Sequence, residues 1–375
     1  MQSSWKRLRR NKGAVAGLLV IVLSVFISAT AYLIAPDNTP DANRMVLEIE
    51  GQHPGFSITM LAIRKELTVP VTPVFERALS GEKPLQTWIP VRSWQFRDSV
   101  LVVQRYVDES TSREEVYPLT DIWYGKGLAP AAPMSVQQLQ ALIQQERLLH
   151  RTYWLGTDKF GRDILSRLII GTRVSLGVGC IAVAISLSIG VLLGAVAGYF
   201  KGRTDDVVMW LVNVVWSMPT LLLVFALTLA LGKGFWQVFI AVGLTMWVSV
   251  ARIIRGQVLA IRELEYVEAA RALGYTHLRI ITKHILPNIM GPVMVVAAGN
   301  FATAIVVEAG LSFLGVGVQP PQPSWGLMIK ENYNFIITHN PLLALAPGIA
   351  IMLLVLAFNL LGNGLRDALD VRSKI

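Results

Sequence analysis

The feature that most constrains this chain is a set of apolar runs, each long enough to cross a lipid bilayer. A transmembrane helix needs about 20 consecutive apolar residues at 1.5 Å rise per residue. Of the 375 residues, 53% are hydrophobic and only 16% are charged, against about 25% charged in soluble domains. We therefore predict an all-α polytopic membrane protein with six transmembrane helices. The runs are Ala14–Ala35, Val174–Phe200, Val207–Leu231 (interrupted by Pro219), Phe235–Ile254, Ile289–Val318 and Leu342–Leu361.

Basic residues beside these runs predict their orientation. Residues 1–13 contain several Lys and Arg residues and no acid, which places the amino terminus inside the cell. Six crossings then place the 201–206 loop, the 255–288 loop and the carboxyl terminus inside as well. The last two segments are rich in Arg and Lys, whereas the short connections on the other side contain few. We interpret the net charge of +9 as a topology signal of an inner (cytoplasmic) membrane protein, not as a nucleic-acid surface.

The basic amino terminus also fits a secretory signal peptide. Ala29-Thr30-Ala31 even supplies an A-x-A cleavage pattern. The apolar run continues past that pattern to Ala35, which favours a retained first transmembrane helix. Residues 1–35 are therefore predicted to be the cytoplasmic amino terminus and the first span.

Residues 36–169 form the largest stretch outside the apolar runs, and we predict an extracytoplasmic α+β insert there. Turn-rich clusters and strand-like alternation indicate a small folded unit. Ser135 and Gln138 fit a capping box for a helix that runs to about Leu149. From Asp163 onward, apolar residues fall on one helical face, which predicts an amphipathic helix lying on the membrane surface. The role of the insert stays open.

The charged segment Glu265–Pro287 lies between two predicted spans. Its first part lacks Pro and Gly and is rich in helix formers, and Gly274 suits the left-handed position after a helix. Thr276 can cap a second helix that runs to about Ile285. Because a residue before proline is disfavoured in the helical region, we expect the helix to break at Leu286. We therefore predict two short helices at an angle to each other, outside the bilayer. An ordinary amphipathic connector fits the composition equally well.

The spacing within this segment resembles the EAA loop of ABC-importer permeases. Nine residues separate Gly274 from His284, where the general pattern has Ile. The dipeptide/oligopeptide branch reads HILPN, as this chain does from His284 to Asn288. The matching residues, to which the resemblance assigns coupling to an ATPase subunit, are Glu268, Ala269, Ala270, Gly274, Leu286 and Pro287.

Further segments resemble the C-type permeases of dipeptide/oligopeptide transporters. These are LGTDKFGRDILSRL at 155–168, EAGLSFLGVGVQPPQPSWG at 308–326 and AFNLLGNGLRDALD at 357–370. Asn363 and Val371 stand where the family has Asp and Pro, which leaves the local geometry of the tail in doubt. The insert at 36–150 has no counterpart and is larger than usual.

The resemblance implies a type I ABC-importer permease fold with a five-helix domain at 170–364, the coupling loop at 255–288 and a cytoplasmic tail at 365–375. It also implies a subunit that forms half of a translocation pathway for di- or oligopeptides or similar ligands. The implied partners are a second permease in a heterodimer, two ATPase subunits and an extracytoplasmic binding protein.

Several kinds of chemistry lack a signature in the sequence. No G-x-x-x-x-G-K-[ST] motif occurs, so ATP would be hydrolysed by another subunit. No nucleophile–base set or ligand-spaced histidines stand out, and we predict neither an enzyme, nor a cofactor, nor a metal site. The single cysteine, Cys180, lies in an apolar run and is expected to be buried packing.

Two polar features near the predicted outer side are candidate sites. The first is a family mark that either seats a binding protein or braces the outer surface, and its glycines predict a tight turn before a helix. It comprises Gly156, Thr157, Asp158, Gly161, Arg162 and Asp163. The second is Glu308, an acid within an apolar run and so a candidate intramembrane polar site. A structural pairing of Glu308 with Arg162, Arg167 or backbone is favoured over a substrate role.

Two other classes of function remain as alternatives. A membrane signalling or assembly scaffold would display the 36–150 insert, but would not need the loop spacing at 268–287. A secondary carrier would show intramembrane charges or broken helices in matched halves, and the chain shows only Glu308 and no internal repeat. The substrate, whether a peptide, a nickel complex or another small ligand, is left open.

Overall fold

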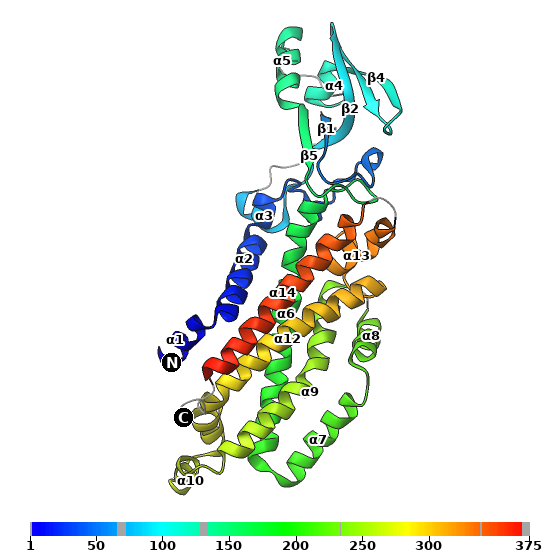
Figure 1. Ribbon diagram of the computed structural model, residues 1–375. Coiled ribbons are helices and arrows are strands. Elements are labelled where there is room, and N and C mark those ends of the chain that lie inside the picture. Colours follow the sequence, from blue (N-terminus) through cyan, green and yellow to red (C-terminus); the bar gives the residue numbers. More distant parts are fainter. Residues whose placement is uncertain (1, 66–72, 128–133, 233, 338–339, 370–375) are drawn as a thin grey trace.

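The computed structural model describes residues 2–65, 73–127, 134–232, 234–337 and 340–369. It shows an elongated molecule in which a helical bundle carries a small α/β unit at one end (Figure 1). The amino-terminal helix α1 (Gln2–Arg10), the end of α14 (Leu342–Leu369) and α10 (Glu265–Ala272) lie at the opposite end of the bundle (Figure 1). The helical elements of the bundle are α1 (Gln2–Arg10), α2 (Lys12–Ile34), α6 (Ile164–Phe200), α7 (Gly202–Trp216), α8 (Thr220–Leu231), α9 (Phe235–Ile261), α10 (Glu265–Ala272), α11 (His277–Arg279), η3 (Ile280–Ile285), α12 (Leu286–Leu314), α13 (Trp325–Asn332), η4 (Tyr333–Ile336) and α14 (Leu342–Leu369).

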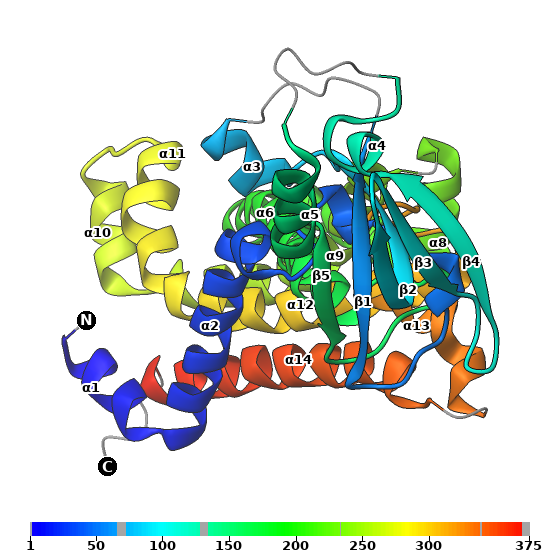
Figure 2. The same cartoon turned by 90° about the horizontal axis from the view of Figure 1, so that it is seen from above.

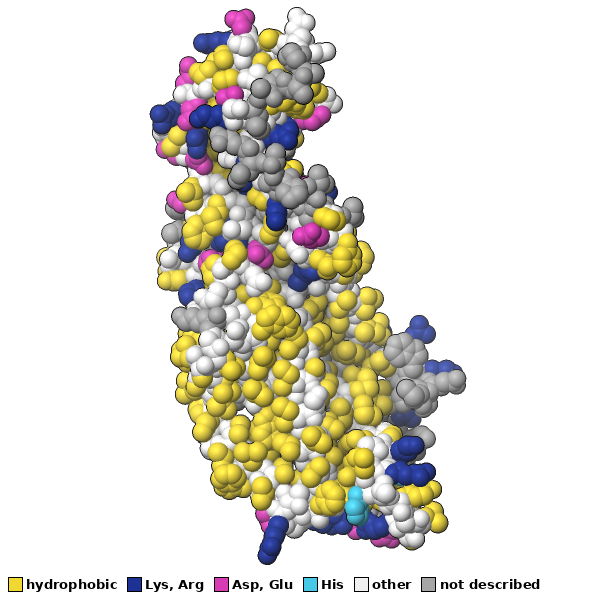
Figure 3. Space-filling model, turned by 180° about the vertical axis from the view of Figure 1, so that it is seen from behind, with side chains coloured by type: hydrophobic (Ala, Val, Ile, Leu, Met, Phe, Trp, Pro, Cys, Tyr) yellow, Lys and Arg dark blue, Asp and Glu magenta, His cyan; other side chains and the backbone are white. Residues whose placement is uncertain are grey.

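Within the described residues, five helical segments are long and apolar enough to cross a membrane, or six if one bent pair counts as a span. The bent pair is α7 with α8, whose axes meet at 90°. Pro219 sits at this break, as the amino-terminal cap of α8. Figure 3 shows a broad hydrophobic band over the bundle, with charged side chains gathered above and below it. This distribution matches the interior of a bilayer between two aqueous faces.

Small residues bring the two central helices, α6 and α9, into close contact. A Cβ added at Gly190 would lie 2.5 Å from Val250 Cβ, and one at Gly194 would lie 2.5 Å from Ala251 O. These glycines let the two helix backbones approach closely, as small residues usually do between packed membrane helices. On the other side of the bundle, α14 packs against α12 and α2. A Cβ added at Gly17 of α2 would likewise lie 2.5 Å from Ala357 O of α14.

The α/β unit is the insert between α2 and α6, and it contains a five-stranded antiparallel sheet of order β4-β3-β2-β1-β5. Both faces of the sheet carry apolar side chains. One face packs on α4 and α5, and the other face packs on the segment around Val46 and Ile49. Figure 2 shows the strands from above the bundle. The elements are η1 (Pro40–Ala42), η2 (Leu47–Ile49), β1 (Phe56–Arg64), α3 (Val74–Ser80), β2 (Gln86–Arg97), β3 (Val100–Tyr106), β4 (Ser112–Pro118), α4 (Leu119–Tyr124), α5 (Val136–Glu146) and β5 (Leu148–Tyr153).

The predicted capping box is present, but the predicted end of its helix is wrong. Ser135 accepts a hydrogen bond from Gln138 N, and the Gln138 side chain accepts one from Ser135 N. The helix ends at Glu146, and Leu148–Tyr153 forms an edge strand instead. This strand pairs with β1, so tertiary pairing overrides the local helical preference.

The predicted surface helix after Asp163 is not a separate element. Residues 164–200, all of which the structure describes, form one continuous helix, α6. Ile164, Ser166 and Arg167 on its first turns are fully buried against the insert and neighbouring segments. No polar face is left exposed there for the membrane surface. The predicted bounds of the 201–206 loop are also wrong, since α7 begins at Gly202 and only Lys201 separates it from α6.

Candidate functional site

The segment between α9 and α12 projects from the end of the bundle opposite the insert (Figure 1). Helix α10 ends in a pair of hydrogen bonds, from Gly274 N to Arg271 O (3.0 Å) and from Tyr275 N to Ala270 O (3.2 Å). Gly274 has φ +77°, the left-handed conformation that this type of helix end requires. Thr276 then caps α11 through Arg279 N. The helix-turn-helix predicted from Gly274 and Thr276 is confirmed.

Helix α10 has one buried face and one exposed face. Val267 and Ala270 are buried in an apolar cluster that also contains Ile254, Ile281 and Ile285. Burial of both side chains fixes the helix against α9 and η3.

The exposed face of α10 carries the residues that are free to meet another molecule. Glu268 and Ala269 are exposed, whereas Ala270 is 4% exposed. Leu273 and Leu278 are 72% and 73% exposed, which is unusual for large apolar side chains near a folded turn. Small, acidic and apolar groups together make a surface suited to a groove in a partner protein.

Polar contacts hold the projecting segment to the preceding helices. Tyr199 Oη, at the end of α6, lies 2.9 Å from His277 Nδ1, and Arg262 donates a hydrogen bond to Tyr199 O. Lys201 Nζ donates to Glu263 Oε1 at 2.7 Å, and this contact holds the pKa of the Glu263 carboxyl below its usual value. These contacts connect the segment to the ends of α6 and α9.

The predicted helix break at Leu286 is wrong. Leu286 is helical (φ −56°, ψ −42°), and a π-helical turn, η3, connects α11 to α12 without a gap. Leu286 N bonds to Ile281 O, five residues earlier, so the wider turn accommodates Pro287, which has no N–H. Leu286 is half-buried and Pro287 is exposed. The segment is thus continuous with the span that follows.

The side chains of Tyr266 and Asn288, to which the sequence analysis gave no role, connect α10 to this turn. Asn288 Nδ2 donates to Tyr266 Oη at 3.0 Å and to His284 O at 2.7 Å. The His284 ring stacks on Tyr275, with centroids 5.8 Å apart. The HILPN run of the sequence contains both His284 and Asn288, so its last residue was a usable signal for this contact.

At the insert end, the segment 156–163 forms the predicted tight turn before a helix. Gly156 and Gly161 have φ of +80° and +70°, and Asp163 caps α6 by accepting Ser166 N at 2.8 Å. The pKa of the Asp163 carboxyl is raised, because the effect of burial exceeds the opposing effect of the hydrogen bonds from Ser166. A Cβ at Gly161 would overlap Val46 O, so the turn fits only around glycine.

The charged side chains of this segment form a buried ion-pair cluster. Arg162 Nε donates to Asp158 Oδ2 at 2.6 Å, and Arg162 Nη2 donates to Glu331 Oε2 at 2.7 Å. Arg167 Nη2 reaches the same Glu331 oxygen at 3.4 Å. Arg162, Arg167 and Asp158 are at most 1% exposed. The sequence analysis missed Glu331, which lies in α13 between two of the quoted motifs.

The same segment is hydrogen-bonded to the insert. Thr157 is fully buried, and its hydroxyl accepts a hydrogen bond from Gln52 N and donates one to Ile49 O. Arg162 also reaches Asn43 Oδ1 at 3.3 Å. The cluster therefore joins the insert, α6 and α13 at one point.

The predicted pairing of Glu308 with Arg162 or Arg167 is wrong. Both arginines are engaged by Asp158 and Glu331, whereas Glu308 Oε1 accepts a hydrogen bond from Ser312 at 2.6 Å. Glu308 is fully buried, and among the described residues its Oε2 has no hydrogen-bond partner. Ser312 in turn accepts Val318 N at 3.0 Å, which fixes the chain after α12.

Cys180 also differs from its expectation, because it is exposed on α6 rather than buried. The position faces away from the core formed by α9 and α12 in the single subunit. Among the described residues, no group of three or more His, Cys, Asp or Glu side chains is placed to hold a metal ion.

The apolar bundle with its bent helix pair defines a polytopic membrane protein. A family model described as the inner membrane component of binding-protein-dependent transport systems matches residues 190–375. A second, described as the N-terminal TM domain of oligopeptide transport permease C, matches residues 1–48. Neither match includes residues 49–189, which hold most of the insert.

Comparison with individual proteins agrees with these matches. The chain is 41% identical over 222 residues to the glutathione transport system permease protein GsiD of Pectobacterium atrosepticum, covering 59% of this chain and 73% of the relative. It is 42% identical over 239 residues to the dipeptide transport system permease protein DppC of Bacillus subtilis, covering 64% and 74%. Solved structures of the MetNI methionine ABC transporter in inward-facing conformations include a chain matched with 19% identity and a TM-score of 0.46, covering 55% and 97%.

The chain belongs to the permease subunits of binding-protein-dependent ABC importers, in the branch of the dipeptide and oligopeptide C-type permeases. The predicted function as a permease subunit is confirmed, and the scaffold alternative finds no support.

Proposed function

We propose that this subunit forms half of a translocation pathway for di- or oligopeptides or similar small ligands, and that α10 couples it to a separate ATPase subunit. The observation that carries this proposal is the division of α10 into an anchored face and an exposed face. Val267 and Ala270 fasten the helix to the bundle, while Glu268 and Ala269 remain free. A partner that moves α10 would move α6 through Tyr199 and α12 through the continuous π-helical turn.

We infer that α10 and both termini face the cytoplasm and that the insert lies outside. Helix α1, the end of α14 and α10 share one end of the bundle (Figure 1). The bias of basic residues places that end inside. This orientation requires that the bent pair α7 and α8 counts as one crossing, which makes six. A topology reporter inserted at Gly55, in an open turn of the insert, is expected to report the outside.

The partners follow from family membership and remain part of the proposal. They are a second permease subunit, two ATPase subunits and an extracytoplasmic substrate-binding protein. The relatives are named for glutathione and for dipeptides, which supports a small peptide-like cargo. Because Thr157, Asp158 and Arg162 are buried, we infer that the 156–163 segment braces the outer surface rather than seating the binding protein. Glu308 is enclosed in the same way, which favours its structural role over a substrate role.

Co-purification of the membrane complex tests the coupling proposal. The wild type is compared with Glu268→Arg and Gly274→Asp, and with Glu146→Arg in the insert as a matched charge reversal. ATPase subunits are expected with the wild type and the control, and to be lost from both loop variants. Membrane insertion should be unchanged, because Glu268 is exposed, and Asp at position 274 meets only the local backbone strain of φ +77°, with no atom within 4 Å of the added Cβ. Retention of the ATPase by both loop variants would exclude α10 as the coupling element.

A further inference from the structure

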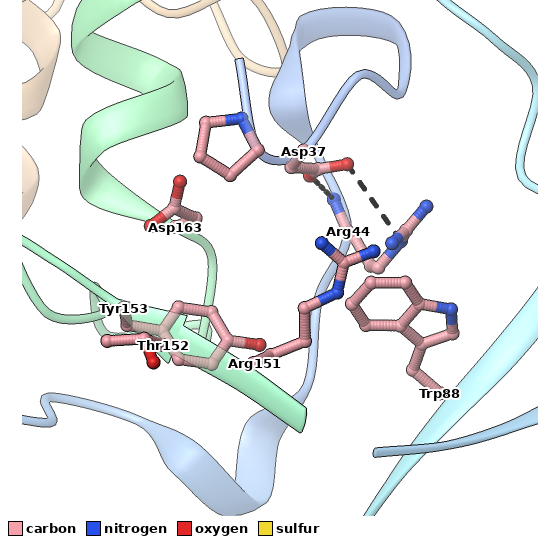
Figure 4. A pocket seen from close by; sticks show the side chains of 8 residues that line it. Asp37, Arg44, Trp88, Arg151, Thr152, Tyr153 and Asp163 are labelled. Carbon is pink, nitrogen blue, oxygen red and sulfur yellow. Dashed lines mark hydrogen bonds and ion pairs between the residues drawn. The ribbon is translucent and has the colours of Figure 1, made fainter. Parts of the chain in front are cut away.

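A hollow lies between the insert and the start of the bundle, next to the end of α2. Figure 4 shows the side chains of Asp37, Arg44, Trp88, Arg151 and Asp163 around it. They come from the chain after α2, from β2, from β5 and from the cap of α6. The adjoining hollow shares Arg44, Trp88 and Arg151, and Lys83 also lines it.

Two guanidinium groups share one indole ring in this hollow. Arg44 Cζ lies 3.6 Å from the Trp88 ring centroid, and Arg151 Cζ lies 4.9 Å from it. Stacking on Trp orients both planar groups. Among the described residues, Arg44 Nε, Arg151 Nε and Trp88 Nε1 are buried without a hydrogen-bond partner. Burial lowers the pKa of Arg44; the charge of Asp37 opposes this effect and the charge of Arg151 adds to it.

The carboxylates nearby are engaged by other donors. Asp37 accepts hydrogen bonds from Thr39 and from Arg44 N, and reaches the Arg44 side chain only at 3.9 Å. Asp163 accepts both Ser166 N and the Ser166 hydroxyl. Glu82, which lines the adjoining hollow, is engaged by Asn38 and Arg77. Within the described part of the chain, Arg44 therefore has only the long ion pair with Asp37, and neither Asp37 nor Asp163 bonds to Arg151.

We propose that this hollow binds an oxyanion, a phosphate or carboxylate group, held between Arg44 and Arg151. Guanidinium groups match such oxygens geometrically and form strong charge-assisted hydrogen bonds with them. An anion there would connect the end of the first span to the sheet and to the start of α6. Neither matched family region includes Trp88 or Arg151.

The surroundings favour the head group of an anionic phospholipid as the source. The hollow begins at Pro36, directly after α2, and therefore lies at the level of lipid head groups if α2 crosses the membrane. Exposed apolar side chains lie on α2 and α3 nearby: Leu33 (59%), Phe75 (77%) and Leu79 (49%). Helix α3 packs on α2, so these side chains can contact acyl chains beneath the head group. A free anion is the other source of the same chemistry.

Thermal unfolding of the full-length chain in neutral detergent, followed by tryptophan fluorescence, tests the proposal. The probes are short-chain phosphatidylglycerol, short-chain phosphatidylcholine and inorganic phosphate. Phosphatidylglycerol is expected to raise the unfolding midpoint, and its apparent Kd should be about tenfold weaker in Arg44→Gln and Arg151→Gln. Arg151→Lys should keep part of the affinity, and Arg97→Gln, at the far end of β2, should keep all of it.

The sources are separated by the probes. Stabilisation by phosphatidylglycerol but not by phosphate assigns the head group, and equal variant-dependent stabilisation by phosphate assigns a free anion. The proposal is overturned if the wild type responds to neither anion, a result that does not depend on the folding of any variant. It is also overturned if phosphatidylglycerol binds equally well to Arg44→Gln, Arg151→Gln and the wild type.

Discussion

Arg162 and Glu331 form a buried ion pair across 169 positions of sequence, with Nη2 and Oε2 2.7 Å apart. Arg162 belongs to the turn before α6, and Glu331 belongs to α13, the short helix that precedes the last span. The pair ties the two ends of the permease region together on the side that carries the insert. Asp158 completes the set by accepting the Nε of Arg162.

Removal of Arg162 is expected to destabilise the protein strongly. Arg162→Ala leaves Glu331 and Asp158 buried without their main partner, which costs about 3–5 kcal/mol. Denaturant unfolding of the purified subunit in detergent measures the loss. Arg97→Ala, an exposed arginine of the same insert, should change the unfolding free energy by no more than about 0.5 kcal/mol. Equal losses in both variants would contradict a structural role for the cluster.

A side chain at Gly161 is expected to lower the unfolding free energy more than one at Gly55, a glycine with a similar backbone conformation. Gly161→Ala meets both the left-handed strain at φ +70° and an overlap with Val46 O. Gly55→Ala at φ +82° meets only the strain, because no atom lies within 4 Å of the added Cβ. The Gly55 variant should lose about 1 kcal/mol of unfolding free energy. The Gly161 variant should lose about 1–3 kcal/mol more, and the same denaturation series compares the two.

Adjacent alanines of α10 are expected to respond differently to a charge. Ala270→Glu places an unpaired carboxylate in the apolar cluster around Ile281 and should cost about 3 kcal/mol of stability. Ala269→Glu lies on the exposed face, should change stability by about 0.5 kcal/mol at most, and should reduce ATPase co-purification. Thermal unfolding and pull-down on the same two variants separate the effects. A stable Ala269→Glu variant with full ATPase recovery would contradict the assignment of the exposed face.

Labelling of Cys180 is expected to report its depth in the membrane. It is the only cysteine of the chain and is exposed on α6, within a candidate span. A lipid-soluble maleimide should modify it in membranes, whereas a charged, membrane-impermeant reagent should modify it only after detergent solubilisation. Cys180→Ser is the blank. Rapid reaction with the charged reagent in intact membranes would place this part of α6 outside the bilayer.

Much of the architecture follows from local patterns that the sequence displays directly. The apolar runs identify the spans, because backbone polar groups in hydrocarbon must be satisfied within each helix. Gly274 and Thr276 mark the turn after α10, since a left-handed glycine and a capping hydroxyl act over a few residues. Ser135 and Gln138 identify the start of α5 for the same reason. These interactions are short in sequence, so their spacing is enough.

The tertiary structure alone decided whatever depends on contacts between distant segments. Leu148–Tyr153 became a strand because β1 offers it an edge. The partner of Arg162 is Glu331 rather than Glu308, and Ala270 is buried while Ala269 is not. Pairing is set by partners far along the chain, and burial is set by which face of a helix is packed. Spacing along the chain encodes neither.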